Sequence, residues 1–128
     1  MTEFTVVDRF QKNKDWISWV LNEAGMSLSR PRTNYLRANA LFYSLLKLAP
    51  KTGRTHQIRV HLKSIGHPVV SDLIYTPSKL IKFDLLWCPR LFLHSARLSF
   101  YGTKSKKTFD FKSDLPNDLK RVILSFRK

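Results

Sequence analysis

The sequence has little cysteine, few acidic residues and no long apolar run. Its one cysteine in 128 residues, Cys88, excludes an internal disulfide and makes a metal site built on cysteines implausible. No stretch approaches the roughly 18 consecutive apolar residues of a membrane span, so no membrane partner is expected. Nine acidic residues stand against 23 lysines and arginines, a net charge of +14. A domain this basic usually binds nucleic acid, because its field attracts phosphates.

The N-terminus also lacks the pattern of a targeting signal. It reads MTEFTVVDRF, with Glu3 and Asp8 among its first ten residues. A secretory signal needs a basic start followed by an apolar stretch, and organelle transit peptides contain few acidic residues. We therefore expect the chain to work in a reducing, cytosol-like compartment, either the cytoplasm or an organelle matrix.

What the sequence does contain is enough for one folded domain over residues 1–128. Hydrophobic residues make up 43% of the chain, and hairpin-like turns separate strand and helix patterns, which predicts the α+β class. Strands are expected at 4–10, 43–48, 91–101 and 108–111. Helices are expected at about 16–25, with Asp15 as the cap, from about 54 to 65, and at 117–126. Residues 26–32 and 73–84 have the composition of loops, the second with one possible helical turn.

The sequence indicates neither a metal site nor a reactive cysteine. The histidines lie at 56, 61, 67 and 94, without carboxylates or cysteines at ligand spacing, so no metal site is expected. Cys88 lies in LLWCPR, a context more typical of a small buried residue than of a reactive thiolate.

The most informative stretch is GRTHQIRVH at 53–61. It gathers hydrogen-bond donors at a predicted helix start, where free backbone N–H groups and arginine favour an anion. Arg54 and Arg59 are five residues apart and point to different faces. One is expected to contact solvent or phosphate, and the other to reach inward to a carboxylate. The alternative is an ordinary solvated basic face.

Residues 51–75, KTGRTHQIRVHLKSIGHPVVSDLIY, resemble the signature of the RluA-type pseudouridine synthases, which isomerise uridine in ribosomal and transfer RNA. YSLLKLAPKTGR, LFLHSARLSF and FDFKSDLPNDLKRVI follow the family's order, and MTEFTVVDRF is similar to the strand that leads into YSLL. The resemblance covers roughly 95 residues, 2–10 and 41–126. It implies the C-terminal part of the catalytic domain, a partial synthase fold with a mixed, mostly antiparallel sheet and flanking helices. It also implies structured RNA as the partner and no cofactor.

Two departures from the family matter. Residues 11–40 are an insert where the family has a short turn. The insert carries an apolar stripe, which must be buried on this chain or on a partner, and the basic residues Arg30, Arg32 and Arg37, which are expected to contact RNA. The second departure is that the sequence contains no Arg-Leu-Asp motif, which holds the family's nucleophilic aspartate. Asp72 matches a structural aspartate of the family, preceded by Ser71 where the family usually has glycine.

The resemblance assigns roles to the remaining site residues. Arg59 matches the arginine that pairs with the nucleophile, and Ile58 matches the apolar residue on which the target base packs. The residues that match the lining of the substrate cleft are Arg54, Thr55, His56 and Gln57. Leu93 and His94 match a second wall near the base. Without a partner's aspartate, Arg59 is expected to be an unpaired cation.

Two functional hypotheses follow. The chain is half of an enzyme, completed by a complementary chain that carries the catalytic aspartate, or it is a non-catalytic RNA-binding module, for example on ribosomal particles. In the family, both halves of the catalytic domain share the central sheet. We therefore expect this chain to expose a sheet edge and an apolar face.

Overall fold

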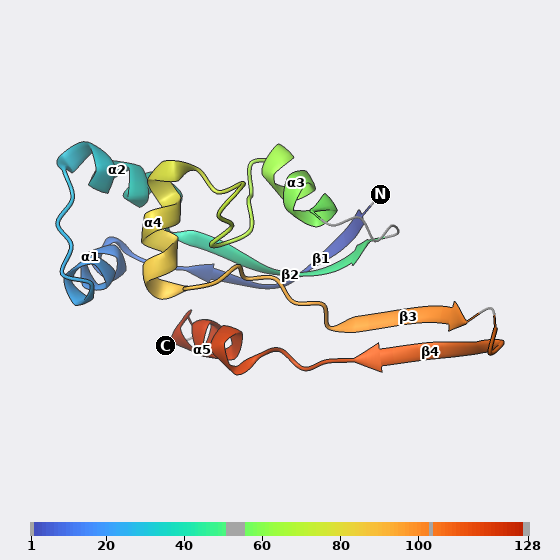
Figure 1. Cartoon of the computed structure of the whole chain (residues 1–128). Coiled ribbons are helices and arrows are strands. Elements are labelled where there is room, and N and C mark those ends of the chain that lie inside the picture. Colours follow the sequence, from blue (N-terminus) through green and yellow to red (C-terminus); the bar gives the residue numbers. More distant parts are fainter. Residues whose placement is uncertain (1, 51–55, 103, 127–128) are drawn as a thin grey trace.

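The computed structural model describes residues 2–50, 56–102 and 104–126. Helices are interspersed with two pairs of antiparallel strands, which confirms the α+β class (Figure 1). The elements are, in order, β1 (Thr2–Gln11), α1 (Lys14–Glu23), α2 (Arg30–Asn39), β2 (Phe42–Pro50), α3 (Gln57–Ser64), α4 (Ser78–Trp87), β3 (Arg97–Gly102), β4 (Lys107–Lys112) and α5 (Asn117–Phe126).

β1 and β2 form an antiparallel hairpin whose connection is the insert with α1 and α2. The hairpin has apolar side chains on both faces. Phe4 pairs with Leu48 near one end, and Phe10 pairs with Tyr43 near the other. A β-bulge at Val7 shifts the register between these two pairs. Leu48 and Tyr43 are five residues apart on β2 and therefore point to opposite faces. Each half of the hairpin thus offers a different face for packing.

One helix covers each of these faces. α3 lies over the end of the hairpin that carries Phe4 and Leu48, and its Leu62 is buried there. α5 covers the other face, where the ring of Phe126 stacks on Tyr43 with centroids 5.2 Å apart. Figure 1 shows the two helices on opposite sides of the hairpin.

The insert folds back on its own chain and supplies much of the core. Ile17 and Val20 of α1 and Leu36 of α2 are almost fully buried. They form one hydrophobic cluster with Ala40 and with Phe83 of α4. Of the two alternatives for the apolar stripe, burial within the chain is therefore the one observed.

An aromatic cluster joins the insert to three further elements. Trp16 of α1 lies 6.1 Å from Tyr43 of β2, 5.5 Å from Trp87 of α4 and 5.8 Å from Phe126 of α5, between ring centroids. Steeply inclined aromatic pairs of this kind each contribute about 0.5–1.5 kcal/mol beyond the area that they bury. The ammonium group of Lys12 lies over the Trp16 and Phe126 rings at the edge of the cluster.

β3 and β4 form a second antiparallel hairpin, which we call the β3–β4 ribbon. Figure 1 shows it extending away from the helices and from the first hairpin. Leu98 lies opposite Phe111, and these side chains are 58% and 56% exposed. The expected exposed apolar face is therefore present on this ribbon.

The sequence pattern misses two helices. α2 includes part of the predicted loop 26–32, because Pro31 lies in its first turn, where the missing N–H of proline removes no helical hydrogen bond. α4 includes most of the predicted loop 73–84. Its apolar residues lie almost all the way round the helix, so the sequence lacks the regular spacing of apolar residues that indicates a helix with one buried face.

Other boundaries differ by a few residues. Asn13, not Asp15, caps α1, because the Asn13 side chain accepts a hydrogen bond from the N–H of Trp16 at 3.1 Å. β3 begins only at Arg97, so the first half of the predicted strand 91–101 is coil. The predicted helix start at 54 or 55 lies outside the described residues. Helix 117–126 and the strand around 43–48 are confirmed.

Candidate functional site

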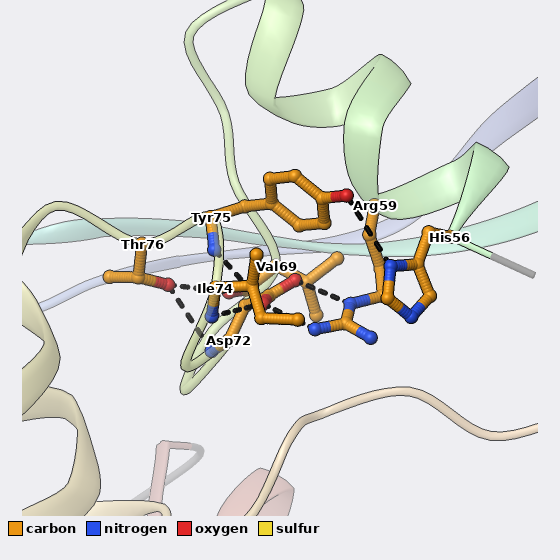
Figure 2. A network of polar contacts seen from close by, with 7 residues as sticks. All are labelled: His56, Arg59, Val69, Asp72, Ile74, Tyr75 and Thr76. Carbon is orange, nitrogen blue, oxygen red and sulfur yellow. Dashed lines mark hydrogen bonds and ion pairs between the residues drawn. The ribbon is translucent and has the colours of Figure 1, made fainter.

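Arg59 and Asp72 form an ion pair at the centre of the candidate site (Figure 2). The Nε of Arg59 donates to Oδ2 of Asp72 at 2.7 Å, and its Nη2 donates to Oδ1 at 2.6 Å. Asp72 has no exposed surface, and the Arg59 side chain is 15% exposed. Such a two-pronged pair fixes the plane of the guanidinium as well as its position. The expectation that Arg59 is an unpaired cation is wrong, because a carboxylate 13 residues later in the same chain neutralises it.

Backbone groups hold the Asp72 carboxylate from its other side. The N–H groups of Ile74 and Tyr75 donate to its Oδ1 at 3.0 and 3.1 Å. The hydrogen bond from Arg59 is the largest cause that lowers the pKa of Asp72. Burial opposes it, and the two N–H groups lower the pKa further. The same bond raises the pKa of Arg59, so the two groups stabilise each other in the charged form.

The turn that carries Asp72 is held by side-chain hydroxyls. The Oγ1 of Thr76 donates to the carbonyl of Val69 at 3.1 Å and accepts from the N–H of Asp72 at 3.2 Å. Ser71 has φ of 59°, a left-handed conformation that favours glycine. Its buried hydroxyl donates to the carbonyl of Cys88. The turn is thus tied to the end of α4, and the direction of the Asp72 carboxylate is fixed.

Tyr75 joins the turn to the beginning of α3. Its hydroxyl lies 3.3 Å from Nδ1 of His56, and Figure 2 shows the two side chains meeting above the ion pair. The guanidinium of Arg59 and the ammonium of Lys63 lie 5.4 and 5.9 Å from the centre of the Tyr75 ring. His56 has φ of 67°, which costs a non-glycine residue about 1–2 kcal/mol. Strain of this kind is often found where a site requires one particular side-chain position.

The predicted cleft residues that are described begin α3. His56 is exposed at the cap, and Gln57 and Ile58 are half-buried in the first turn. Ile58 lines a small hollow between α3 and β1–β2. Arg54 and Thr55 lie outside the described residues.

Leu93 and His94 lie in the coil that leads into β3. The carbonyl of Leu93 accepts a hydrogen bond from Nη2 of Arg90 at 3.3 Å. The Nε2 of His94 lies 3.0 Å from the carbonyl of Ser113, just after β4. Both predicted residues are half-buried, and these contacts fix the coil between α4 and the ribbon.

The three predicted arginines of the insert are exposed on α2. Arg30 and Arg37 are seven residues apart and share a face, whereas Arg32 lies on another side of the helix. The ammonium of Lys79, from α4, lies 5.6 Å from the ring centre of Tyr35 and adds a cation beside α2. The helix itself contains no acidic residue.

Sequence reasoning missed the contacts of Tyr75 and Thr76 and the pairing of Asp72 with Arg59. One local signal was available: an aspartate whose side chain accepts from N–H groups two or three residues later forms an Asx turn, and SDLIYT offers that pattern. The long-range partner of Asp72 leaves no such signal.

Within residues 2–50, 56–102 and 104–126, no three histidine, cysteine or acidic side chains gather where they could hold a metal ion. A helix with the length and apolar character of a membrane span is likewise not found in this part of the chain.

Comparison with known proteins gives a consistent result, although no protein-family model matches the sequence. An RNA pseudouridine synthase of Chloroflexus aurantiacus is 41% identical over 96 residues, 73% of this chain and 29% of that protein. The dual-specificity RNA pseudouridine synthase RluA of Vibrio vulnificus is 37% identical over 93 residues, 71% of this chain and 36% of that protein. The ribosomal large subunit pseudouridine synthase D of Zymomonas mobilis is 41% identical over 83 residues, 62% and 26% of the two chains.

The chain thus spans only about a quarter to a third of these relatives' length. These relatives belong to the same family that the sequence motifs resemble. The chain is a partial RluA-type pseudouridine synthase domain.

Proposed function

We propose that this chain binds structured RNA as part of a pseudouridine synthase and does not isomerise uridine by itself. The isomerisation breaks a C–N glycosidic bond, rotates the base and forms a C–C bond. A carboxylate must reach the sugar or the base for this reaction. The observation that carries the proposal is that the carboxylate beside Arg59, that of Asp72, has no exposed surface and accepts four hydrogen bonds from the protein.

We assign the RNA-binding role to the start of α3 and to the insert. Arg54, Thr55, His56 and Gln57 are assigned to the wall of the substrate cleft, and Ile58, Leu93 and His94 to the surfaces on which the base packs. Arg30, Arg32 and Arg37 are assigned to phosphates, because they are exposed on a helix without acidic residues. Arg59 is a positioning residue in this proposal: it keeps α3 and the Asp72 turn in a fixed relation.

The proposal is tested with RNA that contains uridine tritiated at C5, because isomerisation releases that label into water. We expect the purified chain to bind this RNA and to release no tritium above background. Release above background would overturn the claim of incompetence, and Asp72→Asn would then show whether this buried carboxylate takes part. Failure to bind RNA in a filter assay at low salt would overturn the RNA-binding claim.

A second candidate is an enzyme completed by a complementary polypeptide that carries the nucleophile. It is favoured by the exposed pair Leu98 and Phe111, because a two-stranded ribbon is only marginally stable in water without a covering layer. Co-expression with the unmatched part of the Chloroflexus aurantiacus relative tests this candidate. Co-purification with restored tritium release supports it, whereas separate elution of the two polypeptides contradicts it. Pairing of Arg59 within the chain favours the non-catalytic function instead, since the site needs no second carboxylate to neutralise the arginine.

A further inference from the structure

The β3–β4 ribbon has two chemically different faces. Leu98 pairs with Phe111 on one face, and the ring of Phe109 stacks against that of Phe111 with centroids 6.3 Å apart. Residues on the other face include Arg97, opposite Lys112, and Tyr101. Because side chains alternate along a strand, one face of the ribbon is apolar and the other is polar.

The charged residues of the ribbon are almost all basic. Between residues 97 and 112 the single acidic residue is Asp110, which makes a two-pronged ion pair with Arg97 at 2.9 and 2.7 Å. In that pair, Arg97 and the one acidic residue of this stretch neutralise each other. Four exposed lysines remain. Lys104 and Lys106 lie in the turn, Lys112 lies on the polar face, and Lys107 lies beside the turn on the side of Leu98 and Phe111.

The shape of the ribbon suits contact with a polyanion outside the cleft. Each strand has six residues, so the ribbon reaches about 20 Å, and it is about 5 Å across between its strands. Figure 1 shows that its turn lies at the end farthest from α1 and α2. Tyr101 is 61% exposed on the polar face, where its ring is available to an unpaired base.

We propose that the lysine-rich turn of the β3–β4 ribbon and its polar face bind the phosphate backbone of the RNA, at a site separate from the candidate site around Arg59. The proposal rests on the RNA-binding function proposed above. RNA fits better than a protein partner, because the exposed lysines gather in and beside the turn, and the one acidic residue of the ribbon is already paired with Arg97. The opposite face, with the exposed Leu98 and Phe111, suits polypeptide packing.

The test compares two variants with equal charge. The ribbon variant is Lys104→Ala, Lys106→Ala and Lys107→Ala together, and the control removes three exposed lysines elsewhere: Lys14→Ala, Lys47→Ala and Lys120→Ala. The probe is a fluorescent RNA stem-loop of about 16 base pairs, a length that a small RNA-binding domain can span. Circular dichroism confirms that both variants retain their secondary structure.

Each lysine that contacts a phosphate contributes about 0.9 to the slope of log K against log salt. For three lysines, a rise from about 50 to about 200 mM salt should weaken the unaltered chain about 40-fold more than the ribbon variant. The control variant should keep most of the original slope. Equal slopes for the ribbon variant and the unaltered chain, with RNA still bound, would overturn this inference alone and leave the lysines a role in solubility. Equal loss in both variants would also overturn it, since a general field would then explain binding. Failure of the unaltered chain to bind overturns the proposed function as well.

Discussion

Replacing Asp84 by asparagine tests whether a buried carboxyl group near the site makes the fold sensitive to pH. Asp84 lies in α4 and is 2% exposed. The N–H of Ser71 donates to its carboxyl group, and no described group donates to its Oδ1. Burial is the largest cause that shifts its pKa, raising it from 3.8 to about 7, and the Ser71 bond opposes the shift. Through this hydrogen bond to Ser71, the Asp84 carboxyl group also contacts the turn that carries Asp72.

The sign of the effect follows from the raised pKa. The folded protein keeps this proton up to about pH 7, whereas the unfolded chain releases it near pH 3.8. The stabilisation is therefore present below the unfolded pKa and is lost as the pH rises through the folded one. A shift of about three units corresponds to about 4 kcal/mol at most, with a slope approaching 1.4 kcal/mol per pH unit. Asp84→Asn stays neutral and can still accept from Ser71. We expect it to lack this slope and to be about 1–3 kcal/mol more stable than the unaltered chain near pH 8, after the cost of a buried amide.

The free energy of unfolding is measured by urea titration between about pH 5 and about pH 8, followed by tryptophan fluorescence. The informative quantity is the difference between the two proteins, in which the histidines cancel. Asp114→Asn makes the same chemical change at an exposed position and serves as the control. Asp72 does not interfere, because its lowered pKa affects stability only as the pH falls below the ordinary range of aspartate. A constant difference between Asp84→Asn and the unaltered chain across the range would refute the reasoning.

Three other predictions concern stability and association. Asp72→Asn leaves Arg59 without its carboxylate, and we expect it to lower the free energy of unfolding by about 3 kcal/mol in urea titrations; a loss below about 1 kcal/mol would contradict the structural importance of the pair. Ile17→Ala should cost about 2–5 kcal/mol in the same assay, because Ile17 is 1% exposed in the core cluster, whereas an insert that is only an appendage would leave the transition unchanged. The isolated chain should self-associate in sedimentation velocity experiments, and Leu98→Lys should reduce the self-association. A monomer with a sharp, reversible thermal transition would argue against an exposed apolar face that drives association.

The sequence predicts those parts of the fold whose signals are local. α5 is predictable because its apolar residues recur on one face. The ends of α1 and α3 are predictable because glycine favours the left-handed conformation that ends a helix, and Gly25 and Gly66 have φ of +66° and +83°. α4 was missed because its apolar residues surround the helix. The insert packs against Phe83 of this helix, a long-range contact that the sequence pattern does not indicate.

The site shows the same division between local and long-range signals. The sequence predicts a helix that begins near 54 or 55, and the family resemblance implies a structural role for Asp72. The sequence also leaves open that one of Arg54 and Arg59 reaches inward to a carboxylate. It does not indicate which carboxylate, because the chain between Arg59 and Asp72 includes the end of α3 and a turn whose path depends on hydroxyl contacts. Family resemblance suggested a different partner for Arg59, one that this sequence does not contain in its usual motif.

Stability is distributed unevenly over this partial domain, and the insert explains why. Five of the six residues in the buried core cluster, all but Phe83, come from the insert at 11–40. A chain that matches only about a third of a synthase can therefore bury a core at the end where the insert packs on α4 and β2. Among the described residues, no comparable layer covers the β3–β4 ribbon, whose Leu98 and Phe111 are exposed. Regions with few buried contacts open at low free energy, so the ribbon should exchange its amide protons well before α1 does. The end of the molecule that lacks a covering layer is also the end that we propose reaches RNA.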